Sequence, residues 1–174
     1  MGTGIIVCGL NGCGKSTLGI ALAKAIGFYF IDVENLFFSK YNVLEPYAKP
    51  RAREEVEKLL LAEVNEHENF VFASVKGNYG AEVTAMYKYA VLIEVPEELR
   101  SQRVRKRSFQ RFGKRMLAGG DLYEQEERFF RMAKERSEDY VEKWVDTLEC
   151  PVIRIDGTKS IEENVDYIIR QINM

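Results

Sequence analysis

Residues 8–19 read CGLNGCGKSTLG, and they directly follow the short apolar run Ile-Ile-Val at 5–7. Three glycines fall within the six residues 9–14, and a lysine and two hydroxyl side chains come immediately after them. Glycine lets the chain turn tightly with its backbone N–H groups pointing inward, and a helix that starts near Lys15 adds the positive end of its dipole. The stretch therefore predicts a strand, a phosphate-binding turn and a helix, in that order.

The pattern Gly9-x-x-x-x-Gly14-Lys15-Ser16 matches the P-loop motif at every fixed position and has the strand and helix that the motif requires on either side. We expect Lys15 to reach the β- and γ-phosphates of a nucleoside triphosphate, Ser16 to hold Mg²⁺, and Thr17 to donate to a phosphate. A glycine-rich turn without a ligand is the alternative, and it leaves the complete motif unexplained. The residues of this stretch expected to bind ATP are Gly9, Asn11, Gly12, Cys13, Gly14, Lys15, Ser16 and Thr17.

Short apolar runs alternate with longer helical patterns along the whole chain. The runs at 5–9, 28–32, 70–75, 89–95 and 152–156 predict strands, and the patterns at 15–26, 33–40, 51–68, 97–109 and 122–148 predict helices. A last helix is expected after Ser160, where Ser-Ile-Glu-Glu forms a capping box. Apolar strands separated by helices indicate a single α/β domain over residues 1–174, a three-layer α/β/α sandwich around a five-stranded parallel sheet. Ligands of proteins with such sheets bind at the carboxyl ends of the strands.

Composition limits the classes of partner. The 174 residues carry a net charge of −2, which argues against a general polyanion binder, and we expect no nucleic-acid partner. No apolar run approaches the roughly 20 residues of a membrane helix, so no membrane partner is expected. Three cysteines at scattered positions give no disulfide framework, and we expect a cytoplasmic protein, either monomer or homodimer.

Residues 100–115 contain eight Lys or Arg side chains and no acid. Arg103 and Arg107 are four residues apart, so on a helix they share one face and repel each other unless an anion lies between them. A polyphosphate is the obvious anion, because guanidinium groups bind phosphate oxygens in pairs. The segment predicts a helical lid over about residues 108–121, with the glycine pair at 119–120 as a hinge. A solvated basic face or an RNA-binding patch are the alternatives.

Three features resemble the small P-loop kinases of the nucleoside monophosphate kinase-like group, which includes adenylate, shikimate and gluconate kinases. They are the P-loop within the first twenty residues, the arginine segment after the fourth strand, and the ending VIRIDGT at 152–158 before a capped helix. The resemblance implies the P-loop NTPase fold. It also implies that Arg103 stacks near adenine, Arg107 contacts the transferred phosphate, and Arg111 reaches the γ-phosphate or the acceptor. The turn at Gly157 and Thr158 would then line the adenine.

The acceptor side begins where the second strand ends, at Asp32. Resemblance to shikimate-type kinases implies that Asp32 holds a Mg²⁺-bound water or accepts the proton of the attacking hydroxyl. The alternative is that Asp32 only caps the helix after it. Adenylate-type kinases carry Asp-Gly-x-Pro-Arg after the third strand, whereas this chain reads SVKGNYG at 74–80. Our acceptor-binding candidates are Asp32, Glu34, Arg51, Lys76, Asn78 and Tyr79, and our catalytic candidates are Lys15, Asp32, Arg107 and Arg111.

The sequence thus predicts an ATP- and Mg²⁺-dependent phosphotransferase that moves the γ-phosphoryl group to a small-molecule hydroxyl or phosphate. A nucleoside or nucleoside monophosphate kinase is one alternative. An ATP-binding regulatory protein with little phosphotransfer is another, and the absence of an acid after the third strand favours it. The loop at 74–80 matches no pattern that identifies the acceptor.

Overall fold

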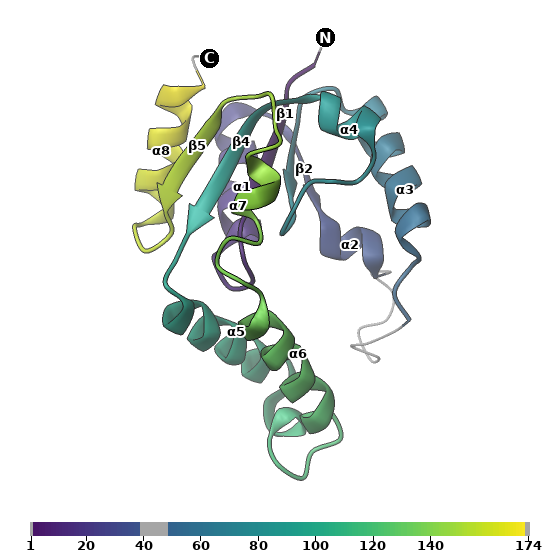
Figure 1. Ribbon diagram of the computed structural model, residues 1–174, viewed down its shortest axis with the longest axis vertical. Helices are drawn as coiled ribbons and strands as arrows, with labels where there is room; N and C mark the ends of the chain where they lie inside the picture. The colour runs from purple at the N-terminus through teal and green to yellow at the C-terminus, as the bar shows by residue number, and fades with distance from the viewer. Residues whose placement is uncertain (1, 39–48, 173–174) are drawn as a thin grey trace.

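Five strands form one fully parallel sheet in a computed structural model, which describes residues 2–38 and 49–172 (Figure 1). The strands are β1 (Gly4–Cys8), β2 (Tyr29–Asp32), β3 (Phe70–Ala73), β4 (Tyr87–Glu94) and β5 (Val152–Asp156). Their order across the sheet is β2-β3-β1-β4-β5, which places β1 in the centre. The sandwich expected from the alternating apolar runs is confirmed, because strands buried on both faces must be apolar throughout.

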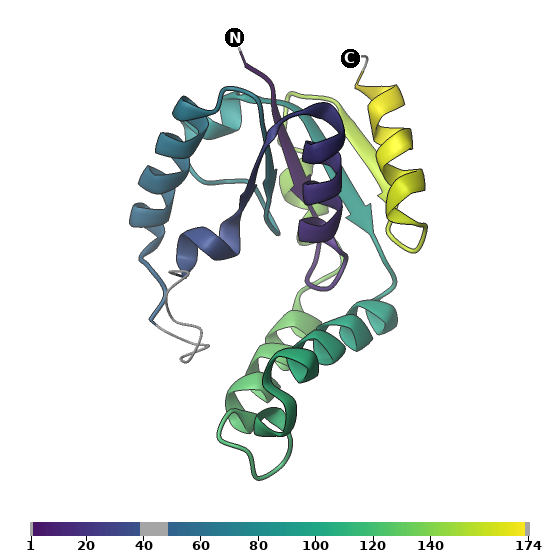
Figure 2. The same cartoon turned by 180° about the vertical axis from the view of Figure 1, so that it is seen from behind.

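Helices cover both faces of the sheet. On one face lie α1 (Lys15–Ile26) and α8 (Ile161–Gln171), side by side in Figure 2. They pack on alternate strand residues such as Ile5, Val7 and Ile155. On the other face lie α2 (Val33–Phe37), α3 (Arg53–Glu66), α4 (Ala81–Ala85) and α7 (Glu142–Val145), which pack on residues such as Ile6 and Phe72. None of the described helices is long and apolar enough to cross a membrane.

A helical hairpin projects from the carboxyl end of β4, away from the sheet (Figures 1 and 2). It consists of α5 (Glu97–Phe112), the 3₁₀ turn η1 (Gly113–Met116) and α6 (Tyr123–Glu135), and we call it the lid. Its own small core holds Val104, Met116 and Phe130. The predicted lid range 108–121 corresponds to its tip, the last turn of α5 and the chain up to α6.

The helices differ from the prediction in number as well as in their bounds. The pattern at 122–148 is two helices, because α6 packs on α5 whereas Val141 and Val145 pack into the core of the sheet, and one straight helix cannot serve both surfaces. The short helix α4 was not predicted. The helix expected at 33–40 is observed as Val33–Phe37, and residues 39 and 40 lie outside the described residues.

Candidate functional site

The P-loop joins β1 to α1 and requires glycine where it touches the base of the lid. Gly12 has φ +84°, and a Cβ there would lie 2.4 Å from the carbonyl oxygen of Arg100 on α5. Gly14, with φ +94°, is the residue from which α1 starts. The predicted turn is therefore present, and it is held against the lid by backbone contact that no larger residue permits.

Lys15 folds back over the turn. Its Nζ donates to the carbonyl of Leu10 at 3.1 Å and lies 3.9 Å from Sγ of Cys13. Cys13 is buried and belongs to the core under α1, so its side chain contributes packing. The ammonium of Lys15 thus lies over the backbone that surrounds a bound phosphate in a P-loop.

Ser16 and Asp32 meet at the end of the second strand. The Ser16 hydroxyl donates to Oδ2 of Asp32 at 2.5 Å, and Oδ1 of Asp32 accepts from the backbone N–H of Glu34 at 3.0 Å. Asp32 therefore caps α2 with one oxygen and contacts the P-loop serine with the other, so the two roles considered for it are compatible. Hydroxyl and carboxylate oxygens are hard ligands of the kind Mg²⁺ prefers. Among the described residues, no group of three or more His, Cys, Asp or Glu could hold a metal ion.

A cavity of about 390 Å³ adjoins the P-loop between α5 and the turn after β5. Arg103 lines it and donates to the carbonyl of Gly157 at 3.1 Å. A Cβ at Gly157 would lie 2.4 Å from Cγ2 of Val95, so a larger residue would clash with that side chain. Of the predicted ATP-binding residues, the lining contains Gly12, Cys13, Gly14, Thr17, Arg103, Arg107 and Gly157. The volume falls in the range of small-ligand sites.

Other lining residues of this cavity were not among the predicted nucleotide-binding residues. They come from the start of α8 and the turn before it: Lys159, Ser160, Ile161 and Asn164. The capping box could have predicted these residues, because it marks the start of α8, which lies beside the turn after β5. Thr158, by contrast, turns to its own strand. Its hydroxyl and N–H both donate to Asp156, which lowers the pKa of that carboxyl.

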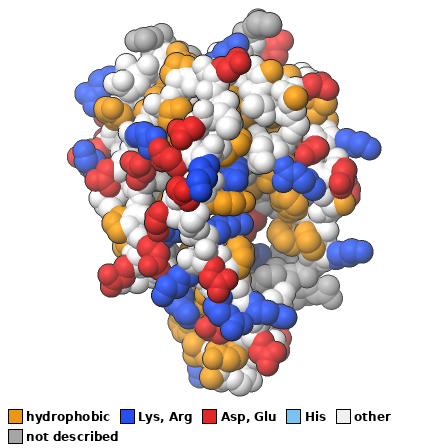
Figure 3. All heavy atoms as spheres, viewed as in Figure 1, with side chains coloured by type: hydrophobic (Ala, Val, Ile, Leu, Met, Phe, Trp, Pro, Cys, Tyr) orange, Lys and Arg blue, Asp and Glu red, His pale blue; other side chains and the backbone are white. Residues whose placement is uncertain are grey.

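The lid arginines divide into two groups. Arg103 and Arg107 line the cavity beside the P-loop, whereas the Arg111 guanidinium lies over the Phe112 ring at 5.1 Å near the tip of the lid. Arg115 is engaged with Asp121, also at the tip. Figure 3 shows Lys and Arg side chains gathered over the lower part of the molecule, where the lid lies. A role for Arg111 at a phosphate would therefore need the lid to move.

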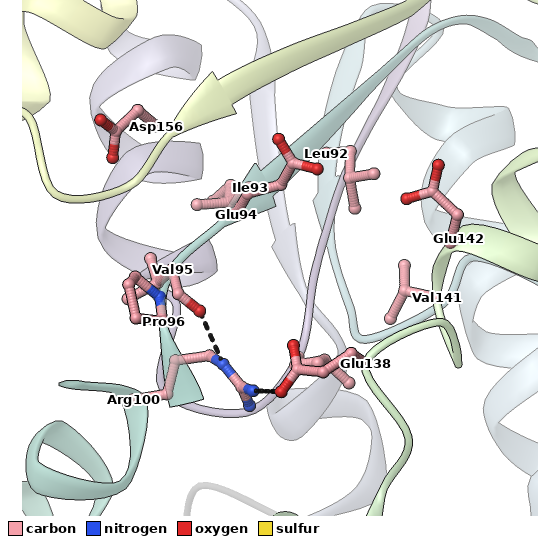
Figure 4. Close-up of a pocket in the computed structure, with 11 residues that line it drawn as sticks. Leu92, Ile93, Glu94, Val95, Pro96, Arg100, Glu138, Val141, Glu142 and Asp156 are labelled. Atoms are coloured by element: carbon pink, nitrogen blue, oxygen red, sulfur yellow. Dashed lines mark hydrogen bonds and ion pairs between the residues drawn. The ribbon is translucent and has the colours of Figure 1, made fainter. Parts of the chain in front are cut away.

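The lid is fastened to the body at its base. Arg100, 4% exposed, donates from Nε to the carbonyl of Val95 at 2.9 Å and from Nη2 to Glu138 at 2.6 Å (Figure 4). Because Glu138 follows α6, this one side chain ties together the two ends of the lid. A second cavity of about 470 Å³ opens beside this contact, on the side of α7.

One residue inside the lid is left without a partner. Glu126 on α6 is 1% exposed, and neither carboxylate oxygen has a hydrogen-bond partner among the described residues. Burial raises the pKa of this carboxyl, with the nearby charge of Glu127 as a second cause.

The acceptor candidates lie around the ends of β2 and β3 but are mostly engaged with protein. Arg51 donates to the carbonyl of Leu36 at 2.8 Å and fastens α2 to the chain before α3. Tyr79 is 8% exposed, with its ring edge-on to Phe37 and Phe72, so it is mainly a packing residue.

The remaining candidates are more accessible. Glu34 and Asn78 are exposed, and the Asn78 carbonyl accepts from Arg53. Lys76 lies over the ring of Tyr140. The sequence interpretation missed Arg136, which follows α6 and donates to Oδ1 of the P-loop residue Asn11 at 2.8 Å. No local motif marks Arg136, because only folding brings it to the P-loop.

The chain is similar in sequence to known proteins. A family model described as "AAA domain" matches residues 5–113, well over half of the chain. The chain belongs to this family. It is 31% identical over 173 residues to the uncharacterised protein YqaC of Bacillus subtilis (strain 168), covering 95% of this chain and 94% of YqaC.

Solved structures with the same fold include small kinases. A shikimate kinase from Bacteroides thetaiotaomicron aligns with a TM-score of 0.58 at 19% identity, over 100% of both chains. A deoxyadenosine kinase from M. mycoides aligns with a TM-score of 0.56 at 15% identity, over 98% of this chain and 99% of that one. The expected fold, that of a small P-loop kinase of the nucleoside monophosphate kinase-like group, is thereby confirmed.

Proposed function

We propose that the protein is an ATP- and Mg²⁺-dependent phosphotransferase that moves the γ-phosphoryl group to a hydroxyl or phosphate of a small molecule. The observation that carries the proposal is the 2.5 Å contact between Ser16 and Asp32. It joins the serine of the P-loop to a carboxylate at the end of β2, and a cavity lined by two lid arginines adjoins the same P-loop. A carboxylate at this place can accept the proton of an attacking hydroxyl, a role that nucleotide binding alone does not require.

Each part of the site then has a role. Lys15 neutralises charge on the β- and γ-phosphates, and the inward N–H groups of the P-loop hold the phosphate chain. Ser16, with Asp32 through water, would hold Mg²⁺, which supplies charge neutralisation across the phosphate oxygens. In this proposal Asp32 also accepts the proton of the attacking hydroxyl. Most of the rate enhancement comes from position and charge, since phosphoryl transfer needs little covalent help from the protein.

The lid completes the site. Arg103 and Arg107 lie on one face of α5 toward the nucleotide cavity, where a triphosphate would neutralise their mutual repulsion. Closure of the lid over ATP would exclude water, so that the phosphoryl group passes to the acceptor and not to solvent. Three free cysteines fit a reducing compartment, and we propose a cytoplasmic location.

A nucleotide-gated binding protein is the second candidate, and one observation favours it. β3 ends in Ala73 and the buried Ser74, with no acid to help hold a metal ion. In that case lid closure on ATP would be the output, and transfer would be slow whatever the acceptor.

The test is ADP production from ATP and Mg²⁺ with a panel of acceptors: nucleosides, nucleoside monophosphates, sugar acids, and cyclic polyols related to shikimate. The Lys15→Ala variant serves as the blank. An acceptor that raises the rate far above the background without acceptor, and yields a phosphorylated product, supports the kinase. Tight ATP binding with only slow background turnover across the whole panel would favour the gated binding protein.

A further inference from the structure

A carboxylate lies shut inside the lid, where the proposed phosphotransfer makes no use of it. Glu126 on α6 is 1% exposed, and neither of its oxygens has a hydrogen-bond partner among the described residues. Within residues 2–38 and 49–172, these two oxygens are the only buried side-chain nitrogen or oxygen atoms without one. Buried polar groups in proteins are nearly always paired, so this exception inside a helical hairpin calls for a physical reason.

The contacts between the two lid helices show which residues share a layer of the hairpin. Arg105 on α5 pairs with Glu127 on α6 at 3.0 Å, and its guanidinium lies over the ring of Phe130 at 4.4 Å. Ser108, 8% exposed, lies one turn nearer the tip on α5, as Glu126 does on α6. The middle of the lid core therefore holds two polar residues, at positions that apolar side chains ordinarily fill.

The charged groups on α5, η1 and α6 give Glu126 no counter-charge within the described residues. Basic side chains of the lid are engaged with other groups or exposed: Arg105 with Glu127, Arg115 with Asp121, Arg103 with Gly157, Arg111 over the Phe112 ring, and Lys106, Arg107, Lys114, Arg128 and Arg131 exposed. The charge that acts on the Glu126 carboxyl is the negative one of Glu127. Burial first, and this like charge second, raise the pKa of Glu126.

The packed hairpin thus accommodates a neutral carboxyl better than a charged one. A group whose pKa is raised in the folded state stabilises that state while it is protonated, and this stability is lost as pH rises through the raised pKa. The apolar core of the lid is small, since only Val104, Met116 and Phe130 form its buried cluster. The loss should therefore be felt as local opening of the hairpin, with the sheet unaffected.

We propose that Glu126 makes the lid a proton-sensitive element. While the carboxyl holds its proton, α5 and α6 stay packed; when the proton passes to solvent, the hairpin loosens at this layer and the carboxylate reaches water. Arg103 and Arg107 are carried on α5, so loosening also disturbs their position beside the nucleotide cavity. That consequence rests on the proposed phosphotransfer, whereas the response of the lid to protons does not.

Hydrogen exchange read by mass spectrometry tests the lid without any need for turnover. Protection factors, corrected for the intrinsic exchange rate, are compared between about pH 4 and pH 8, a range that begins near the ordinary glutamate pKa. We expect protection of α5 and α6 in the native protein to fall about 5- to 100-fold toward the upper end, the equilibrium equivalent of burying one group without a partner. Glu126→Gln and Glu126→Met cannot ionise, so lid protection should stay constant in both, and each checks the folding of the other.

Glu124→Gln is the matched control, because it makes the same change at an exposed position of α6 and should keep the native response to pH. Amides of β1 and β4 serve as the internal reference and should not distinguish the native protein from Glu126→Gln. The proposal is overturned if lid protection follows the same course with pH in the native protein and in both Glu126 variants. A response that depends on Glu126, with no transfer to any acceptor, would sustain the proton-sensitive lid and refute the kinase. Transfer to an acceptor with lid protection that does not depend on Glu126 would do the reverse.

Discussion

Replacing Lys15 by alanine should remove phosphoryl transfer while leaving the fold nearly as stable as before. In the structure this ammonium makes one hydrogen bond to protein, to the Leu10 carbonyl at 3.1 Å, and a weak contact to Cys13. Losing one such bond costs about 1 kcal/mol, which lowers the Tm of a domain of this size by about 2–4 °C. The charge that it brings to the phosphates is worth far more in the transition state, about 10²- to 10³-fold in rate.

The assay pairs thermal unfolding with ADP production, and Lys24→Ala is the matched control. Lys24 lies in the last turn of the same helix and is exposed, so its loss removes an equal charge far from the P-loop. We expect the control to keep its turnover and to lose a few tenths of a kcal/mol from the helix dipole. Turnover of Lys15→Ala within about three-fold of the native rate would refute the argument from the P-loop, since the predicted loss is at least about 100-fold.

Three further predictions follow from the site and the lid. Asp32→Asn should lower kcat about 100-fold or more with little change in ATP affinity, because the amide keeps the helix cap but cannot accept a proton; an unchanged kcat in steady-state kinetics would exclude Asp32 as the base. Arg107→Ala should lower kcat more than ATP affinity, since its contact strengthens on lid closure; an equal loss in binding alone would make it a binding group only. Glu126→Met should stabilise the protein by about 1–3 kcal/mol near neutral pH in urea unfolding, because it removes an unpaired buried carboxyl. The folded-state pKa of Glu126 is raised, so the native protein loses stability as pH rises from the ordinary glutamate pKa of about 4.3 through the raised one; a stabilisation that does not shrink toward acid pH would contradict this cause.

The local sequence was enough to predict the fold and the P-loop half of the site. The P-loop could be predicted because its residues are consecutive, and the sheet could be predicted because parallel strands buried on two faces are apolar throughout. The division of 122–148 into α6 and α7 was missed because helical periodicity does not reveal that Phe130 and Val145 face different partners. Likewise the role of Arg100 at the base of the lid is invisible in a segment where every arginine looks alike.

The sequence by itself determined the nucleotide side of this protein, because a turn that holds phosphate is encoded by adjacent residues whose backbone requirements are local. It also put Asp32 at the right edge of the sheet, since strand ends in parallel sheets converge. Only the tertiary structure revealed which distant residues meet beside the P-loop. Lys76, Arg136 and Tyr140 lie as many as 64 residues apart, and they meet because β3 ends beside the P-loop and the chain returns from the lid across it. Such a meeting depends on which surfaces pack together, and packing between distant segments leaves no local pattern.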